Sequence, residues 1–165
     1  MKPPTELWTA CLLGDANKVK QLLREGHAVD EVDECGRAAL WVACRYGEYK
    51  IAEILIDHGA SIHRVTKELG TPLILRACGD SWRHVEVVRL LIKRGVDVNQ
   101  KDAKGWTPLM FACMARNKPL VKLLLENNAA RDVTVGDGLV PPGTTAADLA
   151  RLSQCEDIAE MVECA

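Results

Sequence analysis

Seven consecutive residues, Cys78 to His84 (CGDSWRH), place a thiol, a carboxylate, a hydroxyl and an imidazole close together in the sequence. A thiol activated by a neighbouring imidazole is the arrangement of a cysteine nucleophile or a redox-active cysteine. The same groups could also ligate a metal ion. Whether the segment is any of these or an ordinary loop depends on the elements that surround it.

The other chemically active groups do not form a recognisable site. The seven cysteines are Cys11, Cys35, Cys44, Cys78, Cys113, Cys155 and Cys164. None stands in a Cys-x-x-Cys pair, so neither a zinc ribbon nor a thioredoxin-type redox centre is indicated. The four histidines share no metal-ligand spacing, and the glycine-rich segment 136–143 lacks the Gly-Lys-Ser/Thr ending of a phosphate-binding loop. We therefore expect no enzyme activity, no metal and no cofactor.

The composition is typical of one soluble globular domain, with 48% hydrophobic and 27% charged residues in a chain of 165. A formal net charge of only -2 argues against a protein that binds nucleic acid. No run of roughly 18 apolar residues exists that could span a membrane. The start of the chain lacks the apolar run of a signal peptide, and unpaired cysteines are typical of a reducing compartment. We expect a cytoplasmic or nuclear protein.

A repeating frame organises the chain. The segments that share it most clearly are 7–26, 40–59 and 109–128, each with an initial Leu, an Ala-Cys pair and a later apolar cluster. The intervals from Leu7 to Leu40 and from Leu40 to Leu73 are both 33 residues. The next intervals, to Leu109 and then to Ala147, are 36 and 38 residues. This regularity predicts a row of similar structural units.

Each unit contains two short stretches with the periodicity of a helix. In the second unit, apolar residues recur at helical spacing over 40–45 and 50–57. Gly47 separates the two stretches, and Gly59 follows the second where a left-handed cap is favoured. Helices this short are not stable alone in water, so each must bury its apolar stripe against its neighbours. The pattern predicts an all-α solenoid of helix-turn-helix units.

Segment 102–112 adds a family signature. Asp102, Gly105 and the run Thr107-Pro108-Leu109, followed by Ala112, closely resemble the DxxGxTPLHxA motif of ankyrin repeats. Thr71-Pro72-Leu73 resembles the same opening, and segment 95–99 (GVDVN) resembles the family's closing GADVN. The resemblance covers nearly the whole chain as one domain of five repeats, at about residues 5–30, 31–63, 64–99, 100–132 and 133–165. It implies that β-hairpin-like fingers join the helix-turn-helix units.

The first and last repeats depart most from the signature and are interpreted as caps. Residues 133–165 contain six acids and one base, a charge of about -5. A cap needs a polar outer face, although a docking site for a basic partner is the alternative. The family's histidine position holds Trp8, Trp41, Ile74, Met110 and Asp148. Trp8 and Trp41 are expected to pack between repeats.

The resemblance also implies a function, because ankyrin repeats as a family bind proteins and lack catalytic activity. We expect an adaptor, scaffold or inhibitor that binds one protein partner through repeats two to four, as a monomer. The candidate contact residues are Arg37, Lys104 and Trp106 in the fingers, and Arg45, Tyr46 and Met114 at the ends of first helices. Exposed Trp, Tyr and Arg often dominate binding energy. Trp106 is expected to be exposed, the alternative being that it packs on a neighbouring finger.

Other functional interpretations stay open. A chain this short with five repeats also resembles the compact cyclin-dependent-kinase inhibitors, and a redox sensor or enzyme that uses Cys78 with His84 is a further class. Asn99 resembles the hairpin asparagine that an oxygenase hydroxylates in many ankyrin repeats. Its alternative role is to hydrogen-bond the hairpin backbone.

The repeat frame also assigns positions to the thiols. Cys11, Cys44 and Cys113 stand at the second Ala of the family's TPLHxAA, which predicts small, buried, structural side chains. For CGDSWRH, the 36-residue interval assigns three extra residues to the turn after the first helix of repeat three. The segment is therefore predicted to be a lengthened loop, with Asp80 or Ser81 starting the second helix. Trp82 either folds back onto the neighbouring repeats or stands out for a partner.

Overall fold

The computed structural model describes residues 5–67, 70–79, 81–136 and 138–164. Within these ranges lie ten helices: α1 (Glu6–Leu12), α2 (Ala16–Arg24), α3 (Ala39–Tyr46), α4 (Tyr49–Asp57), α5 (Leu73–Arg76), α6 (Trp82–Lys93), α7 (Pro108–Met114), α8 (Lys118–Glu126), α9 (Ala146–Leu152) and α10 (Glu156–Cys164). The described residues contain no β-strand beyond isolated bridges between Val65 and Pro72 and between Val135 and Thr144. The predicted all-α class is confirmed.

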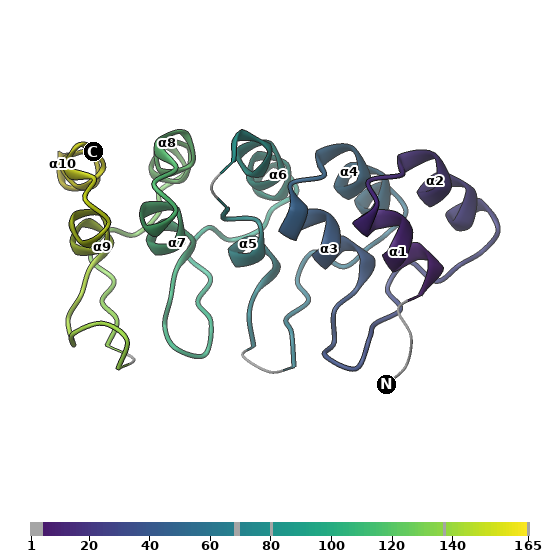
Figure 1. Ribbon diagram of the computed structural model, residues 1–165, viewed down its shortest axis with the longest axis horizontal. Helices are drawn as coiled ribbons and strands as arrows, with labels where there is room; N and C mark the ends of the chain where they lie inside the picture. The colour runs from purple at the N-terminus through teal and green to yellow at the C-terminus, as the bar shows by residue number, and fades with distance from the viewer. Residues whose placement is uncertain (1–4, 68–69, 80, 137, 165) are drawn as a thin grey trace.

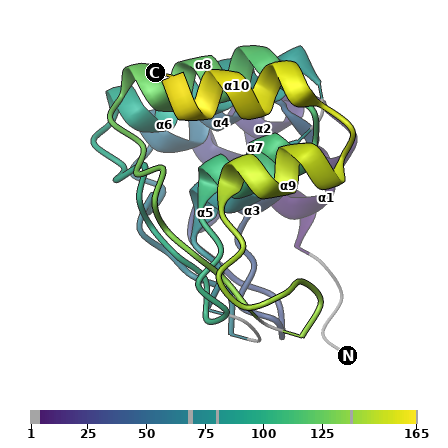
Figure 2. The same cartoon turned by 90° about the vertical axis from the view of Figure 1, so that its left-hand side faces the viewer.

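The helices form five pairs that stand side by side in one row (Figure 1). The odd-numbered helices, here called the inner helices, make one layer, and the even-numbered outer helices make the other. Each layer is continuous, because α1, α3, α5, α7 and α9 contact one another in order, as do α2, α4, α6, α8 and α10. The hairpins that join the pairs, here called the fingers, all project from the same side of the row (Figure 2).

Each finger is closed by a local hydrogen-bond network. Asp102 Oδ1 accepts bonds from the backbone N–H groups of Lys104 and Trp106, at 2.9 and 3.0 Å. Between them Gly105 has a φ of 85°, which residues with a Cβ rarely adopt. Asp33 accepts the equivalent bonds, from the backbone N–H groups of Cys35 and Arg37, in the finger between repeats one and two. The DxxG pattern of the sequence is therefore a hairpin-closing device.

The outer helices end on the left-handed residue that the sequence predicts. Gly26, Gly59, Gly95 and Asn128 all have φ between 63° and 89°. Four residues before each of them stands a fully buried leucine: Leu22, Leu55, Leu91 and Leu124. These leucines form the centre of the core between the two helix layers, and the half-buried Trp8 and Trp41 pack against the same core as expected.

Repeat three starts one residue later than the sequence suggested. The backbone N–H of Thr66 donates to Thr71 O at 3.2 Å, just as Asp102 N donates to Trp106 O, so Thr71 is the equivalent of Trp106. Pro72 is consequently the N-cap of α5, and Ile74 rather than Leu73 matches Leu109. The expected in-register Thr-Pro-Leu opening is wrong by one residue. The Ala77-Cys78 pair now falls on the Ala-Cys positions of the other repeats.

The extra residues of repeat three are divided between two places. Seventeen residues separate Cys78 from Gly95, whereas fifteen separate Cys44 from Gly59, so the turn gains two residues and the preceding finger gains one. The helix absorbs this gain, because α6 has 12 residues and the other outer helices have 9. The prediction of a long loop over CGDSWRH is therefore wrong in part. Trp82 is already the first residue of α6, with Ser81 as its N-cap, and Asp80 lies outside the described residues.

The last repeat has the polar outer face expected of a cap. The acids of α10 (Glu156, Asp157, Glu160 and Glu163) are all exposed. Its inner helix begins with a capping box in which Thr145 and Asp148 bond each other's backbone N–H groups. Asp148 thus has a local structural role at the position where the family places a histidine.

Candidate functional site

Three of the predicted contact residues lie at the ends of inner helices and are accessible. Arg45 and Tyr46 form the last turn of α3, and Tyr46 is 50% exposed. Met114 ends α7 and is 47% exposed. These residues belong to repeats two and four, so repeat three lies between them. We call the exposed side chains of the inner helices, together with the fingers, the inner surface.

An equivalent position recurs along the inner surface. Leu12, Arg45, Met114 and Leu152 occupy it in repeats one, two, four and five, and all four are exposed. In repeat three the position holds Gly79, where an added Cβ would lie 2.4 Å from the His84 ring. The His84 imidazole therefore occupies the space that a side chain would need at this position. Along this row of equivalent positions, exposed Leu12 lies on one side of Arg45 and exposed Met114 lies on the other.

The two basic finger candidates, Arg37 and Lys104, differ in their exposure to solvent. Arg37 is half-buried, forms an ion pair with Asp33 at 2.7 Å, and holds its guanidinium 5.2 Å from the centroid of the Trp41 ring. Lys104 is exposed. Arg37 therefore contributes to the packing of its finger, and Lys104 is the more exposed of the two residues.

Trp106 is not the exposed side chain that its place between Gly and Thr suggested. It is only 6% exposed and belongs to the core cluster, with its ring centroid 5.5 Å from that of Phe111. Thr71 and Thr144, which stand at the same hairpin position, are also buried. This position turns its side chain onto the inner helix, so Trp106 stabilises the finger and offers little surface to a partner.

Trp82 protrudes, and the question that its sequence left open is answered. It is 73% exposed at the start of α6. It lies at the edge of the row where inner and outer helices are joined, beside a groove of about 430 Å³ also lined by Gly14, Gly47 and Tyr49. Trp82 therefore belongs to a different part of the molecule from the fingers.

Sequence reasoning missed two residues at the centre of the inner surface, Arg76 and Phe111. The Arg76 guanidinium lies 5.9 Å from the centroid of the Phe111 ring, and that ring in turn contacts Trp106. Burial, together with the nearby charge of Arg45, lowers the pKa of Arg76 from its usual value. A charged residue inside the short apolar run of α5 was the signal that could have pointed to this position.

The family comparison agrees with this architecture. The model for ankyrin repeats (three copies) matches residues 7–102 and 81–163. The chain belongs to the ankyrin-repeat family. The predicted family is thereby confirmed.

Two of the relatives are ankyrin-repeat proteins by name. YahD of Escherichia coli (strain K12), named as an ankyrin repeat protein, is 26% identical over 96% of this chain and 94% of its own length. The nuclear factor NF-kappa-B p105 subunit of Gallus gallus is 33% identical over 83% of this chain but 14% of its own length. Ankyrin repeat protein nuc-2 of Neurospora crassa is 33% identical over 67% of this chain and 10% of its own length. The chain thus spans nearly all of one relative and a small part of the others.

Membership of the ankyrin-repeat family implies a protein–protein interaction module, and such modules are generally non-catalytic. Among the described residues there is no cluster of three or more His, Cys, Asp or Glu side chains that could hold a metal ion. None of the described helices is long and apolar enough to cross a membrane.

Cys78 occupies the buried cysteine position of the ankyrin repeat, and it lacks the exposure of a redox-active thiol. Its side chain is 7% exposed and its Sγ donates to Ile74 O at 3.2 Å. Burial raises the pKa of Cys78 far above its usual value, so the thiolate that redox chemistry requires is disfavoured. Cys78 is a fourth member of the buried set predicted for Cys11, Cys44 and Cys113, which are all fully buried.

His84 forms hydrogen bonds that hold the CGDSWRH segment in place. Its Nε2 lies 3.2 Å from Arg45 O and its Nδ1 lies 3.0 Å from Ser81 Oγ. Because a carbonyl oxygen only accepts, Nε2 must bear the proton in that bond. Asn117 of repeat four donates to Gly79 O at 2.8 Å and to Ser81 O at 3.2 Å. CGDSWRH therefore ties repeats two, three and four together.

Alkylation of native protein with iodoacetamide tests this assignment of the thiols. Cys164 is exposed, so we expect it to react at the rate of a free thiol. Cys78 and Cys44 should react on the order of a hundredfold more slowly, because they are reached only after local opening. The control is the same reaction in denaturing urea, where all seven cysteines should react. Rapid native labelling of Cys78 would restore the redox-sensor hypothesis.

Asn99 uses both ends of its side chain to join adjacent ankyrin repeats. Its Oδ1 accepts from Ala130 N at 2.8 Å and its Nδ2 donates to Asn128 O at 3.2 Å. Asp30 similarly accepts from Ser61 N at 3.1 Å. The Asn99 side chain therefore bonds backbone groups, but these belong to the next repeat and not to its own hairpin as expected. Hydroxylation of Asn99 stays a prediction.

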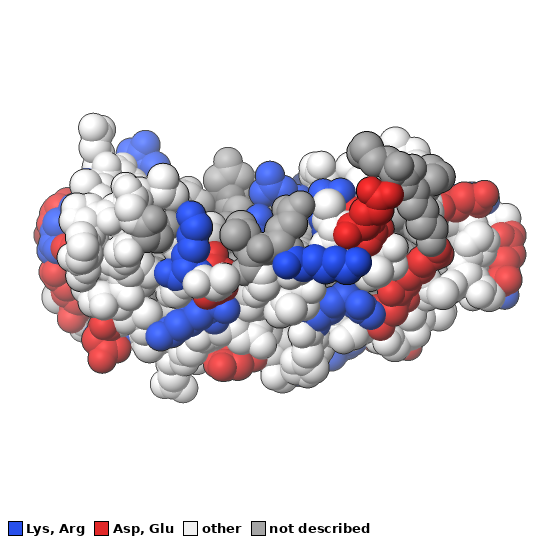
Figure 3. Space-filling model, turned by 90° about the horizontal axis from the view of Figure 1, so that it is seen from below, with Lys and Arg blue, Asp and Glu red and all other residues white. Residues whose placement is uncertain are grey.

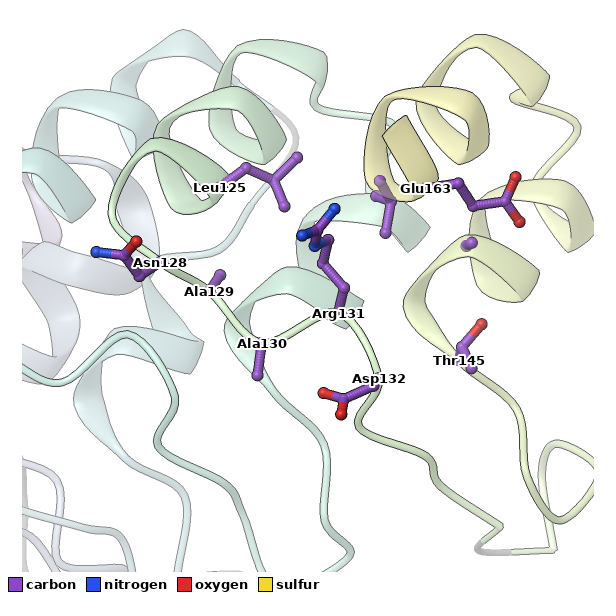
Figure 4. A pocket seen from close by; sticks show the side chains of 10 residues that line it. Leu125, Asn128, Ala129, Ala130, Arg131, Asp132, Thr145 and Glu163 are labelled. Carbon is purple, nitrogen blue, oxygen red and sulfur yellow. The ribbon is translucent and has the colours of Figure 1, made fainter. Parts of the chain in front are cut away.

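A hollow of about 840 Å³ lies between repeats four and five (Figure 4). Leu125 of α8, the segment 128–132 and Glu163 of α10 line it. Glu163 is paired with Arg151 at 2.7 Å. Neither a histidine nor a cysteine is among the residues lining the hollow, so it contains no thiol–imidazole pair.

Proposed function

We propose that the domain is an adaptor or inhibitor that holds one protein partner on the inner surface of repeats two to four. The observation that supports this most is the exposure of Arg45, Tyr46 and Met114 at the ends of α3 and α7, the inner helices on either side of α5. Arginine, tyrosine and methionine are enriched in protein interfaces. The stacked pair of Arg76 and Phe111 lies on α5 and α7 of the same surface.

The rigidity of this surface supports the same proposal. Tyr46 and Met114 stand on helices whose other faces are buried in the core, so binding requires little ordering of the backbone. Inhibition of an enzyme is a narrower form of the proposal. One human relative, 41% identical over 35% of this chain, is named protein phosphatase 1 regulatory subunit 27. That name supports a regulatory role without indicating a kinase as the target.

Affinity capture from a native extract tests the proposal with the double variant Tyr46→Ala/Met114→Ala. Loss of two exposed interface side chains should lower the captured partner by at least about tenfold. The matched control is Leu139→Ala, which removes a 77% exposed apolar side chain outside repeats two to four. Circular dichroism should be the same for all three proteins. Undiminished capture by the double variant, with loss on Trp82→Ala, would move the binding surface to the helix-turn edge.

A further inference from the structure

We propose that Arg45 and Arg76 form a carboxylate-binding subsite on the inner surface, and that the partner segment bound there is acidic. This inference rests on the proposed function and gives the chemistry of the partner. It is carried by the placement of two guanidinium groups on adjacent inner helices.

Arg76 is held in one position by its surroundings. Its guanidinium lies over the Phe111 ring, and its Nε is buried without a hydrogen-bond partner. Arg76 as a whole is only half-buried, and no hydrogen bond or ion pair to its terminal nitrogens is found among the described residues. A guanidinium fixed in this way presents its end to a ligand, which suits the bidentate geometry of a carboxylate.

Arg45 adds a second positive charge from the last turn of α3, which packs against α5. Its charge acts on Arg76 strongly enough to help lower the pKa of Arg76. Among the described residues, neither arginine is in an ion pair with an acid of the chain. Two like charges held together without a paired acid favour the binding of an external anion.

The balance of charge favours a carboxylate over a phosphoryl group. Among the described residues, Asp102 is the carboxylate whose charge raises the pKa of Arg76, and its Oδ1 is already bonded to two backbone N–H groups of its own finger. Arg45, Arg76 and Asp102 together have one net positive charge. A singly charged carboxylate neutralises this charge, whereas a phosphate, at about -2, would leave an excess of negative charge.

The surrounding surface favours a peptide as the source of the carboxylate. Tyr46 and Met114 expose apolar area on the neighbouring inner helices, where residues that flank an acidic side chain could be buried. Seen from the finger side, Lys and Arg lie mainly across the middle of the row, and Asp and Glu lie mainly towards its ends (Figure 3). An acidic segment is therefore attracted to repeats two to four and repelled from the terminal repeats.

Fluorescence anisotropy with labelled hexaglutamate as the probe tests the subsite. We expect wild-type protein to bind hexaglutamate and to leave hexaglutamine unbound. Arg45→Gln and Arg76→Gln should each weaken binding by about tenfold, because each removes a charge-assisted hydrogen-bond donor. The matched control, Lys122→Gln, removes an equal charge from an exposed site on outer helix α8 and should change affinity by less than about twofold.

The outcomes separate this inference from the proposed function. Failure of wild type to bind hexaglutamate, or equal weakening by Arg45→Gln and Lys122→Gln, overturns the subsite. Tighter binding of a matched phosphoserine peptide overturns the assignment to a carboxylate. If the captured partner is lost on Tyr46→Ala/Met114→Ala but kept by Arg45→Gln, the proposed function stands and the subsite does not. Because Arg45 is exposed, its variant is expected to fold even if Arg76→Gln does not.

Discussion

Replacing Trp106 with alanine is expected to lower the free energy of unfolding by about 3–5 kcal/mol, the usual cost of emptying a buried tryptophan site. Trp106 is 6% exposed and its ring packs against Phe111, which in turn lies beneath Arg76. The substitution removes the packing of the Trp106 ring against Phe111 of α7 and leaves a cavity in the core. Its effect on partner binding would therefore follow from loss of structure, so Trp106→Ala is unsuitable as a probe of contact.

Trp82→Ala is the matched control, because it removes the same side chain from a site that is 73% exposed. Its expected effect on unfolding is within about 0.5 kcal/mol. Urea unfolding should be followed by far-ultraviolet circular dichroism, since both variants lose a fluorescent residue. Similar midpoints for the two variants would show that Trp106 is not buried as described.

Gly47→Ala is expected to destabilise the array by about 2–4 kcal/mol, through strain and a clash together. Gly47 ends α3 with φ of 70°, where a residue with a Cβ is strained. The added Cβ would also lie 2.7 Å from Arg83 Cβ and 3.3 Å from the Arg83 carbonyl carbon. Those atoms belong to α6, so the clash can be relieved only by separating repeats two and three at this turn.

Gly59→Ala distinguishes the two causes. Gly59 has φ of 87°, but nothing lies within 4 Å of its added Cβ, so only the strain of about 1–2 kcal/mol applies. Urea unfolding of both variants should show the larger loss for Gly47→Ala. Equal losses would mean that the turn of repeat two does not contact α6 closely.

Local features of the fold were predictable because a few neighbouring residues determine them. The Asp102 carboxylate reaches backbone groups two and four residues away, and Gly95 follows its helix directly. The recurring Ala-Cys pair similarly marks where an inner helix must be small to approach its neighbours. These short-range patterns were enough for the helix pairs, the fingers and the buried thiols.

The candidate contact surface was predictable only in part. Arg45, Tyr46 and Met114 are exposed as expected, because the final residues of α3 and α7 lie on the side of each helix away from the core. The prediction that Trp106 is exposed was wrong, because its position in the finger directs the side chain onto α7. Arg76 was overlooked for a related reason, since the Phe111 ring on which it stacks is 35 residues away in the sequence.

The sequence by itself determined that this protein is a row of ankyrin-type helix pairs. The repeat period can be read directly from the sequence, and the hairpin aspartates and left-handed caps act over only a few residues. Only the tertiary structure decided what the chemically suggestive residues do. Cys78 is enclosed by the core, and His84 and Asn117 join three successive repeats through CGDSWRH. Arg45 and Arg76 are brought close together, and neither forms an ion pair with an acid among the described residues. These outcomes depend on contacts between residues roughly one repeat apart, which stacking creates and linear spacing does not record.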